Sequence, residues 1–566
     1  MNNKRAARPS GAGAASFSDD SLRIYIILGV FALLVLGLFS RLAYVQLVAA
    51  DDYADSARNS RTSVIKVTPR RGTIYDRNGT VLAISVDATT IYANPSEITD
   101  LEAETAQIAS VLGGTPADYQ KKIAQGSSSF AYVKRQADVK LAEQIKAMDL
   151  DGIYFLEDTR REYPCGQVGG QVVGFCNLDG VGVAGLELQY DELLSGTTGK
   201  VVAEYGRNGI PIPDGVGDKE SSVDGQDIVV SIDVVMQEAM ERILEDYTEQ
   251  LGVDTGSVLV DGKTGEIFAA ASTPLFNPAD SSKSKPDSTV LKPLTKSFEP
   301  GSVFKAVTSL KLLETRTMNP KSKLYCPAEI EADGYKVTDS HERPAETMTL
   351  RKIMADSSNI GVSLSTEKMG FDKLNQAIDQ YGLKDATGVD FPGEPDPIVP
   401  DFSGWSRIQG YNISFGQGIT QTPLQMARFY GALTNGGVAC TPHFLVSKPQ
   451  SDETVKYEKT KIIDDKKALK NQISLLKAVV EEGTGTPGHI EGYHVAGKTG
   501  TAEVASDQGG YKKGIYNISF IGFLAESTSS LVCYTGAYEL DAEGNVSPIF
   551  KDIMQEAIER YNIVSK

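Results

Sequence analysis

The chain has 566 residues, enough for about three or four domains and a large hydrophobic core. Hydrophobic residues make up 41% and charged residues 23%, which are the proportions of a globular protein and exclude a collagenous or disordered chain. The formal net charge of -18 argues against bulk binding to nucleic acid, which requires a basic surface.

The first elements predicted along the chain are a tail and a membrane anchor. Residues 1–20 are small and polar with several basic side chains, which predicts a disordered tail. Residues 24–39 form an apolar run, and residues 42–48 extend it if Arg41 reaches the membrane surface. We therefore predict a cytoplasmic tail over 1–22, because it is the more basic flank, and a transmembrane helix over 23–48. A buried core helix and a signal peptide cleaved near Ala50 are the alternatives.

Residues 49–225 are predicted to form a small α+β domain, which we call the pedestal. Residues 61–67 alternate like a strand, and Asn78-Gly79 between two apolar stretches indicates a hairpin, for which the simplest reading is a turn with surface charges. Residues 95–150 alternate short helical patterns with polar loops. Residues 180–190 begin glycine-rich and become helical, but they lack the strand and the Lys-Ser/Thr ending of a phosphate loop. Residues 205–225, rich in Gly, Pro and Asp, read as a linker.

Residues 226–566 begin a second, larger domain. An apolar stretch at 228–232 is followed by a predicted helix at about 234–247. Two strands, 256–260 and 266–271, flank a turn at 261–265. This order predicts a sheet with helices packed on it.

Ser302 and Lys305 form the first motif of chemical interest. Pro300-Gly301 reads as a turn before an apolar helical pattern, so Lys305 is expected one helical turn from Ser302. Ser302 would lie at the electropositive end of that helix. A lysine kept neutral by burial can take a proton from serine and activate it as a nucleophile. The spacing alone is weak, since Ser-x-x-Lys also occurs at 282, 365 and 474, where a solvated helix face is the simpler interpretation.

Two further motifs follow. Ser357 and Asn359, two residues apart, could both point into a cleft if they lie in a tight turn, although a helix N-cap before residues 360–369 is an equally good interpretation. Lys498, Thr499, Gly500 and Thr501 follow apolar residues. An edge strand there could bind a carboxylate and pair with an extended peptide. The same Lys-Thr-Gly letters at 263–265 lie in a predicted turn, so this tripeptide is also weak by itself.

Together, the three motifs have the order of the Ser-x-x-Lys, Ser-Asp-Asn and Lys-Thr-Gly signature of β-lactamases and penicillin-binding proteins. Ser358 stands where the signature has aspartate, a position that varies in the family. Over nearly its whole length the chain resembles a class B penicillin-binding protein: residues 71–79 resemble the first pedestal motif, 182–187 a later one, and 416–418 a loop of the catalytic domain. The stretch from 497 to 523 is similar to septal (FtsI-like) or sporulation (SpoVD-like) members.

The resemblance implies a fold and a reaction. The fold is a membrane anchor, an α+β pedestal over 49–225 and an α/β transpeptidase domain over 226–566, β-lactamase-like, with an antiparallel sheet covered by helices. The reaction is D,D-transpeptidation of peptidoglycan stem peptides outside the membrane, inhibited by β-lactams, without a metal or organic cofactor. The setting that the resemblance implies is septal wall synthesis, and the implied partner is a lipid II polymerase of the FtsW/RodA kind, with other division or elongation proteins.

The same resemblance assigns roles to residues. Ser302 is the nucleophile, Lys305 the general base, and Ser357, assisted by Lys498, passes a proton to the leaving D-alanine. Asn359 holds the substrate amide. The strand from Thr499 through Gly500 to Thr501 binds the terminal carboxylate, and the backbone N–H groups of Ser302 and Thr501 form the oxyanion hole.

Other interpretations remain open at this point. A D,D-carboxypeptidase, a β-lactamase or a penicillin sensor carries the same three motifs, but the anchor and pedestal disfavour a β-lactamase. A membrane-anchored scaffold with an inert catalytic domain is disfavoured because all three motifs are intact. Five cysteines form no cluster typical of zinc, and Cys165 and Cys176 could pair in an oxidising compartment, although structural or unpaired cysteines are the first interpretation.

Overall fold

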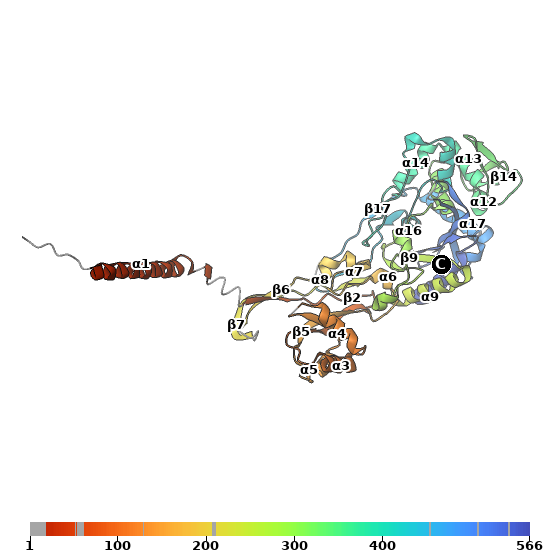
Figure 1. Ribbon diagram of the computed structural model, residues 1–566. Helices are drawn as coiled ribbons and strands as arrows, with labels where there is room; N and C mark the ends of the chain where they lie inside the picture. The colour runs from red at the N-terminus through yellow and green to blue at the C-terminus, as the bar shows by residue number, and fades with distance from the viewer. Residues whose placement is uncertain are drawn as a thin grey trace, which may run out of the picture. The chain divides into compact units, whose positions relative to one another are not determined.

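The computed structural model describes residues 19–50, 52–53, 62–127, 129–205, 211–451, 454–506, 509–541 and 544–566. Residues 1–18 of the predicted tail and residues 206–210 of the predicted linker lie outside this set, and α1 begins at Asp19, within the range predicted as tail. The chain divides into two compact units, Met1–Thr68 with Thr198–Ser222, and Pro69–Thr197 with Val223–Lys566. Figure 1 labels the elements along the chain.

The first unit contains the apolar helix α1 (Asp19–Leu47). Its segment Leu22–Leu47 has a mean hydropathy of 2.5, and none of that segment is buried inside the protein. An apolar helix of this length can cross a membrane. The predicted N-terminal apolar helix is therefore present, and by length and composition it is suited to a single-pass anchor.

The first unit also contains a three-stranded antiparallel sheet, in the order β1 (Thr62–Val67), β6 (Gly199–Tyr205) and β7 (Pro211–Glu220). The prediction of a linker over 205–225 was wrong for β7, which pairs with β6 from Tyr205↔Pro211 to Lys200↔Glu220. The prediction relied in part on the prolines of this segment, which are typical of linkers. They are tolerated because β7 is an edge strand, where a missing N–H need not cost a ladder hydrogen bond.

The second unit begins with the predicted hairpin, in which β2 (Ile74–Tyr75) and β3 (Val81–Ala93) pair antiparallel. They belong to a six-stranded sheet with the order β16-β8-β2-β3-β4, where β5 also pairs with β3. The other strands are β4 (Ala131–Ala137), β5 (Ile153–Glu162), β8 (Ile228–Val230) and β16 (Leu445–Ser447). Since β2 pairs with β8 in parallel, one sheet connects the pedestal to the start of the second predicted domain.

Short helices surround this sheet in the pedestal. They are α3 (Leu101–Leu112), α4 (Pro116–Gln125), α5 (Val139–Lys146), α6 (Gly170–Val173), α7 (Gly185–Gln189) and α8 (Asp191–Ser195). The helices α3, α4 and α5 contribute Ile108, Ile123 and Ile145 to a core with Ile91 of β3. The short helices predicted over 95–150 are therefore confirmed, while β4 between α4 and α5 is a strand that the prediction of helices and loops did not place.

The charged residues of the pedestal motifs meet in the interior. Glu187 Oε2 accepts from Arg71 Nε at 2.6 Å, and Glu187 Oε1 accepts from Arg161 Nε at 2.7 Å. The Glu187 side chain is fully buried. Asp76 likewise accepts from the backbone N–H groups of Asn78 and Thr80. These charges hold the pedestal together, so the reading of the hairpin as a turn with surface charges was wrong.

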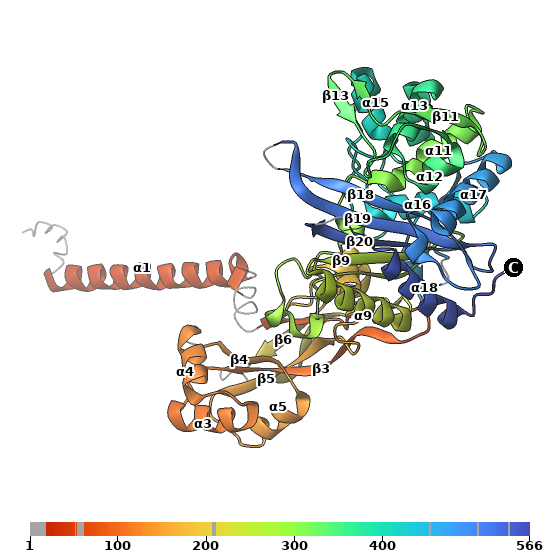
Figure 2. The ribbon, with the colours of Figure 1, turned by 90° about the vertical axis from the view of Figure 1, so that its right-hand side faces the viewer.

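A five-stranded antiparallel sheet forms the centre of the second predicted domain. Its order is β10 (Ile267–Ser272), β9 (Thr255–Asp261), β20 (Leu531–Leu540), β19 (Tyr511–Ala525) and β18 (His494–Ala505). The helices α9 (Val234–Leu251) and α18 (Ser547–Tyr561) cover one face, and the other face carries a helical lobe (Figure 2). Each face buries its own apolar core.

The α-helices of the lobe are α11 (Lys305–Glu314), α12 (Leu350–Ala355), α13 (Asn359–Met369), α14 (Phe371–Gln380), α15 (Arg407–Ser414), α16 (Pro423–Thr434) and α17 (Lys466–Glu482). Further short helices of this part are η1 (Pro278–Lys283), α10 (Lys292–Thr295), η2 (Gly301–Phe304), η3 (Phe402–Gly404) and η4 (Thr486–Gly488).

Three small two-stranded ladders complete this part. They pair β11 (Lys323–Cys326) with β14 (Glu346–Thr349), β12 (Ile330–Ala332) with β13 (Tyr335–Val337), and β15 (Val438–Cys440) with β17 (Lys459–Lys461). The predicted antiparallel sheet covered by helices is thus confirmed.

Candidate active site

Ser302 lies on η2, a short 3-10 helix that leads directly into α11 at Lys305. Residues three apart are eclipsed in a 3-10 helix, so Ser302 and Lys305 share one face, as their spacing predicted. The Ser302 hydroxyl makes no hydrogen bond to any other residue that the structure describes. It is therefore free to contact a substrate.

The loop before Ser302 is held by close backbone packing. Gly301 has a φ of 58°, and a Cβ there would lie 2.7 Å from the carbonyl oxygen of Thr501. The N–H of Gly301 donates to the carbonyl of Gly416 at 2.9 Å. Because only glycine adopts this backbone at no steric cost, Gly301 sets the approach of the nucleophile loop to β18.

Ser357 and Asn359 lie in the turn between α12 and α13, as the second motif requires. Ser357 has a φ of 59°, an unusual backbone for a residue other than glycine. The middle residue, Ser358, is the N-cap of α13, and its Oγ accepts from the N–H of Gly361 at 2.9 Å. The capping role considered for the motif thus falls on Ser358, which leaves the side chains of Ser357 and Asn359 available to the site.

Lys498 lies on β18, the edge strand of the central sheet, as predicted. Its strand passes close to other elements at the two flanking glycines. A Cβ at Gly497 would meet the ring of Phe520 at 2.5 Å, and a Cβ at Gly500 would meet Ser519 Oγ at 2.3 Å. These close approaches explain why glycine occupies both positions.

The three motifs meet at one hydroxyl. Lys305 Nζ donates to Ser357 Oγ at 3.1 Å and to Asn359 Oδ1 at 2.7 Å. Lys498 Nζ donates to Ser357 Oγ at 2.9 Å and also contacts Thr499 Oγ1 at 3.3 Å. Five side chains from three distant segments therefore form one hydrogen-bonded cluster.

Both lysines of this cluster are completely buried. Burial disfavours the charged amine and lowers the pKa of Lys305 to about 7, although the carboxylate of Asp339 opposes this. Burial, together with the neighbouring amine of Lys305, holds the pKa of Lys498 well below its usual range. A neutral Lys305 near pH 7 is suited to accept a proton from a serine hydroxyl.

Thr499 and Thr501 are two residues apart on β18, so their side chains share one face of the strand. Both are partly exposed, while Gly500 between them is buried. Thr499 Oγ1 is hydrogen-bonded to Thr484 Oγ1 at 2.7 Å, a contact that ties the strand to the end of α17. The exposed face of β18 is open to an extended ligand.

The repeated sequence patterns do not join this cluster. Lys285 and Lys368 are exposed, and Lys477 pairs with Glu526 at 3.2 Å. Lys263 lies in the turn between β9 and β10, as predicted. Tertiary contacts therefore single out Ser302, Lys305 and Lys498 from their duplicates.

Two carboxylates near the site were missed by the sequence analysis. Glu299 Oε1 accepts from the N–H of Gly418 at 2.9 Å and from the hydroxyl of Tyr511 at 3.1 Å. Asp339 accepts from the backbone of Ile360 at 2.9 Å. Both belong to contacts across long stretches of sequence, for which a single sequence contains no signal.

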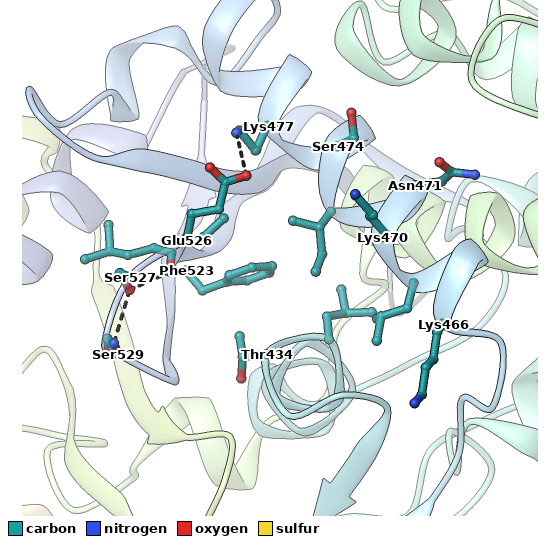
Figure 3. A pocket seen from close by; sticks show the side chains of 15 residues that line it. Thr434, Lys466, Lys470, Asn471, Ser474, Lys477, Phe523, Glu526, Ser527 and Ser529 are labelled. Atoms are coloured by element: carbon teal, nitrogen blue, oxygen red, sulfur yellow. Dashed lines mark hydrogen bonds and ion pairs between the residues drawn. The ribbon is translucent and has the colours of Figure 1, made fainter. Parts of the chain in front are cut away.

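A separate pocket of about 600 Å³ lies between α16, α17 and the turn from β19 to β20 (Figure 3). Its apolar lining includes Leu433, Leu469 and Phe523, and the Lys477–Glu526 ion pair lies at its edge. None of the motif residues is among the described residues that line it. The candidate active site is thus identified by its cluster of hydrogen-bonded side chains and not by this pocket.

Cys165 and Cys176 are free thiols in the structure. Cys176 Sγ donates to Glu187 Oε2 at 3.2 Å, and Cys165 Sγ to the carbonyl of Val81 at 3.5 Å. Burial raises the pKa of both thiols, which keeps them protonated near neutral pH.

Comparisons with known proteins match most of the chain. A family described as the penicillin binding protein transpeptidase domain matches residues 255–555, and one described as the penicillin-binding protein dimerisation domain matches residues 66–230. Stage V sporulation protein D of Bacillus subtilis is 31% identical over 553 residues, covering 95% of this chain and 85% of that protein.

Two further relatives agree with these matches. Peptidoglycan D,D-transpeptidase FtsI of Escherichia coli is 30% identical over 503 residues, covering 87% of this chain and 83% of that protein. The crystal structure of penicillin-binding protein 3 from Mycobacterium tuberculosis, complexed with aztreonam, has a TM-score of 0.69 and 24% sequence identity. It covers 88% of this chain and 97% of that one, which shows a common fold.

Proposed function

The chain belongs to the class B penicillin-binding proteins, and from this membership we propose that it is a serine D,D-transpeptidase that cross-links peptidoglycan stem peptides through an acyl-enzyme on Ser302. The observation that carries the proposal is the cluster in which Lys305 and Lys498 both contact Ser357 Oγ beside the free Ser302 hydroxyl. A neutral, buried lysine one turn from an unbonded serine is the arrangement that serine activation requires.

In the acylation step, the neutral amine of Lys305 takes the hydroxyl proton of Ser302 while Oγ attacks the carbonyl carbon between the two terminal D-alanines. The backbone N–H groups of Ser302 and Thr501 donate to the oxyanion that forms. The C–N bond then breaks, and Ser357, hydrogen-bonded to Lys498, delivers its proton to the departing D-alanine nitrogen. The proton that Lys305 took from Ser302 passes along the Lys305–Ser357 hydrogen bond and restores the Ser357 hydroxyl. The stem peptide is left as an ester on Ser302.

Substrate binding falls to the groups around this cluster. Thr499 and Thr501, with Lys498 close by, bind the terminal carboxylate, and the backbone of Gly500 allows the peptide to lie against the edge of β18. Asn359 holds the amide of the penultimate residue. An edge strand supports this assignment because its outer N–H and C=O groups are not paired within the sheet.

In the second step, the amine of another stem peptide attacks the ester carbonyl, forms the cross-link and returns the proton to Ser302. A β-lactam opens on Ser302 in the same way but remains as a stable ester. The relative from Mycobacterium tuberculosis complexed with aztreonam supports the proposal that this chain also binds β-lactams.

The decisive experiment incubates the full chain in detergent with a fluorescent penicillin, beside a Ser302→Ala variant. We expect covalent label on the native chain and none on the variant. Stem-peptide substrates with an acceptor amine then distinguish the reactions, because a transpeptidase yields a cross-linked dimer and a carboxypeptidase releases only D-alanine. A folded native chain that takes no label contradicts the proposal and favours an inert scaffold.

We also propose a cellular setting. The likeness to FtsI of Escherichia coli supports septal wall synthesis, with the catalytic domain outside the membrane, the tail over 1–22 in the cytoplasm and a membrane polymerase of the FtsW/RodA kind as partner. A fluorescent fusion that gathers at division sites supports the septal role, and one that labels the side wall or the developing spore contradicts it. The boundary between pedestal and transpeptidase domain at 225/226 stays a prediction.

A further inference from the structure

The second motif has Ser358 where the family signature has aspartate. In the structure, this serine lacks the second oxygen with which an aspartate could accept another hydrogen bond. Ser358 is the N-cap of α13 and is 1% exposed. Its one side-chain oxygen accepts from the N–H of Gly361, the third residue of the helix. An N-cap side chain can satisfy the N–H of the second or the third residue. An aspartate has two oxygens for these two groups, whereas serine has one, so Ser358 leaves the N–H of Ile360 without a partner from the cap.

Asp339 provides the missing acceptor. Its Oδ1 accepts from the N–H of Ile360 at 2.9 Å, and its Oδ2 accepts from the hydroxyl of Ser358 at 2.9 Å. The Asp339 side chain is only 9% exposed and is itself held by Arg343 Nε at 2.6 Å. A carboxylate thus lies at the electropositive N-terminus of α13, where a negative charge is favourable.

We propose that Asp339 is a positioning residue of the active site: it supplies, from the segment that follows β13, the carboxylate that the signature places at the middle of the second motif. The carboxylate satisfies the first turn of α13 and fixes the turn that carries Ser357 and Asn359. This inference rests on the proposed function, since it concerns the same site.

Thr338, the residue before Asp339, contacts Asn359, the last residue of the second motif. The carbonyl of Thr338 accepts from Asn359 Nδ2 at 3.0 Å, which turns Asn359 Oδ1 toward Lys305 Nζ at 2.7 Å. Thr338 and Asp339 together therefore hold the middle and last residues of the motif. If this segment shifts, the hydrogen bonds that hold the amine of Lys305 shift with it.

Asp339 also acts through charge. The groups that influence the Lys305 amine are the amine of Lys498, which bonds the same Ser357 hydroxyl, and the carboxylate of Asp339, which is partly neutralised by Arg343. The carboxylate favours the protonated form of Lys305 and opposes the effect of burial. Removing the charge lowers the pKa of Lys305, whereas a purely structural role would not affect it.

The test compares Asp339→Asn, Ser358→Asp and the double variant in the full chain, using the second-order rate of acylation by a fluorescent penicillin from pH 5 to 9. We expect Asp339→Asn to lose about 10-fold at the plateau, since hydrogen bonds to a charged group are lost, and its acidic limb to move to lower pH. The double variant, with a carboxylate restored at position 358, is expected to recover most of the rate. Ser358→Asp alone gains nothing, because two carboxylates then compete for one helix terminus.

Asp356→Asn is the matched control, because this carboxylate is one residue from Ser357 but pairs with Lys352 at 2.7 Å on the surface. An Asp339→Asn variant with the native rate and native pH profile overturns the inference, and so does a loss that Ser358→Asp fails to restore. If Asp339→Asn alone does not fold, a folded and acylating double variant supports the inference and an unfolded one overturns it. Failure of the proposed function is distinct, since the native chain itself would then take no label.

Discussion

Lys305 and Lys498 direct their buried amines at the same oxygen, Ser357 Oγ, at 3.1 and 2.9 Å. Two charged amines so close together in a buried site repel each other, so at least one is neutral near pH 7. The shared hydroxyl lies between a proton acceptor and a proton donor. A cluster of this kind couples the protonation of the two lysines to the reaction.

The pH dependence of acylation is expected to follow Lys305. Its pKa is lowered to about 7, chiefly by burial, so the neutral amine predominates above pH 7 and the protonated amine below it. The acylation rate of the native chain should therefore rise up to about pH 7 and fall roughly 10-fold per pH unit below it. Stopped-flow or gel-based acylation rates between pH 5 and 9 check this. A rate that is constant down to pH 5 would contradict Lys305 as the base.

The same shift predicts how stability depends on pH. Lys305 has a folded-state pKa of about 7 and an unfolded value of 10.5, so unfolding takes up a proton between these values. Since the unfolded state binds more protons there, the free energy of unfolding rises with pH by about 1.4 kcal/mol per unit from this residue. The native chain should gain stability over Lys305→Met as pH rises from 7.5 to 9.5.

Denaturant unfolding of both proteins at the two pH values measures that gain. Lys368→Met is the matched control, because Lys368 is an exposed lysine on α13, outside the buried cluster. Parallel stability curves for the native chain and Lys305→Met would show that Lys305 is charged in the folded state.

Gly301→Ala should damage the nucleophile loop. The φ of 58° costs about 1–2 kcal/mol for a residue with a Cβ, and the new Cβ would lie 2.7 Å from the Thr501 carbonyl. We expect a lower midpoint of thermal unfolding and an acylation rate reduced at least about 10-fold, because Ser302 follows directly. Gly404→Ala is the control, since a Cβ there has open space and should change neither quantity.

Glu187→Gln should destabilise the pedestal. The change leaves the guanidinium groups of Arg71 and Arg161, whose side chains are only 6% and 8% exposed, without their shared carboxylate. Breaking a buried pair of this kind costs about 3–5 kcal/mol, measured as the free energy of unfolding in denaturant. Asp87→Asn is the control, because its ion pair with Arg70 is mostly exposed and should contribute less than about 1 kcal/mol. Equal losses in the two variants would contradict the role of Glu187.

Several elements of the fold could be predicted from the sequence because the patterns that indicate them lie within a few adjacent residues. The apolar run of α1, the Asn78-Gly79 turn and the helix after Ser302 each follow from residues adjacent in the chain. The strand β7 was missed because its composition resembles a linker and its pairing partner β6 decides its structure.

The amino-acid sequence by itself determined which structural elements and motifs this protein has. They are an apolar N-terminal helix, an α+β pedestal, a helix-covered sheet and three motifs in the order of a known signature. Only the tertiary structure decided which copies of those motifs meet, because burial and hydrogen bonding depend on neighbours far apart in sequence. It placed Lys498 and not Lys263 beside Ser357, and it brought Asp339 to the helix terminus that Ser358 caps. Periodicity and propensity act over a few residues, whereas the pKa of a lysine is set by everything packed around it.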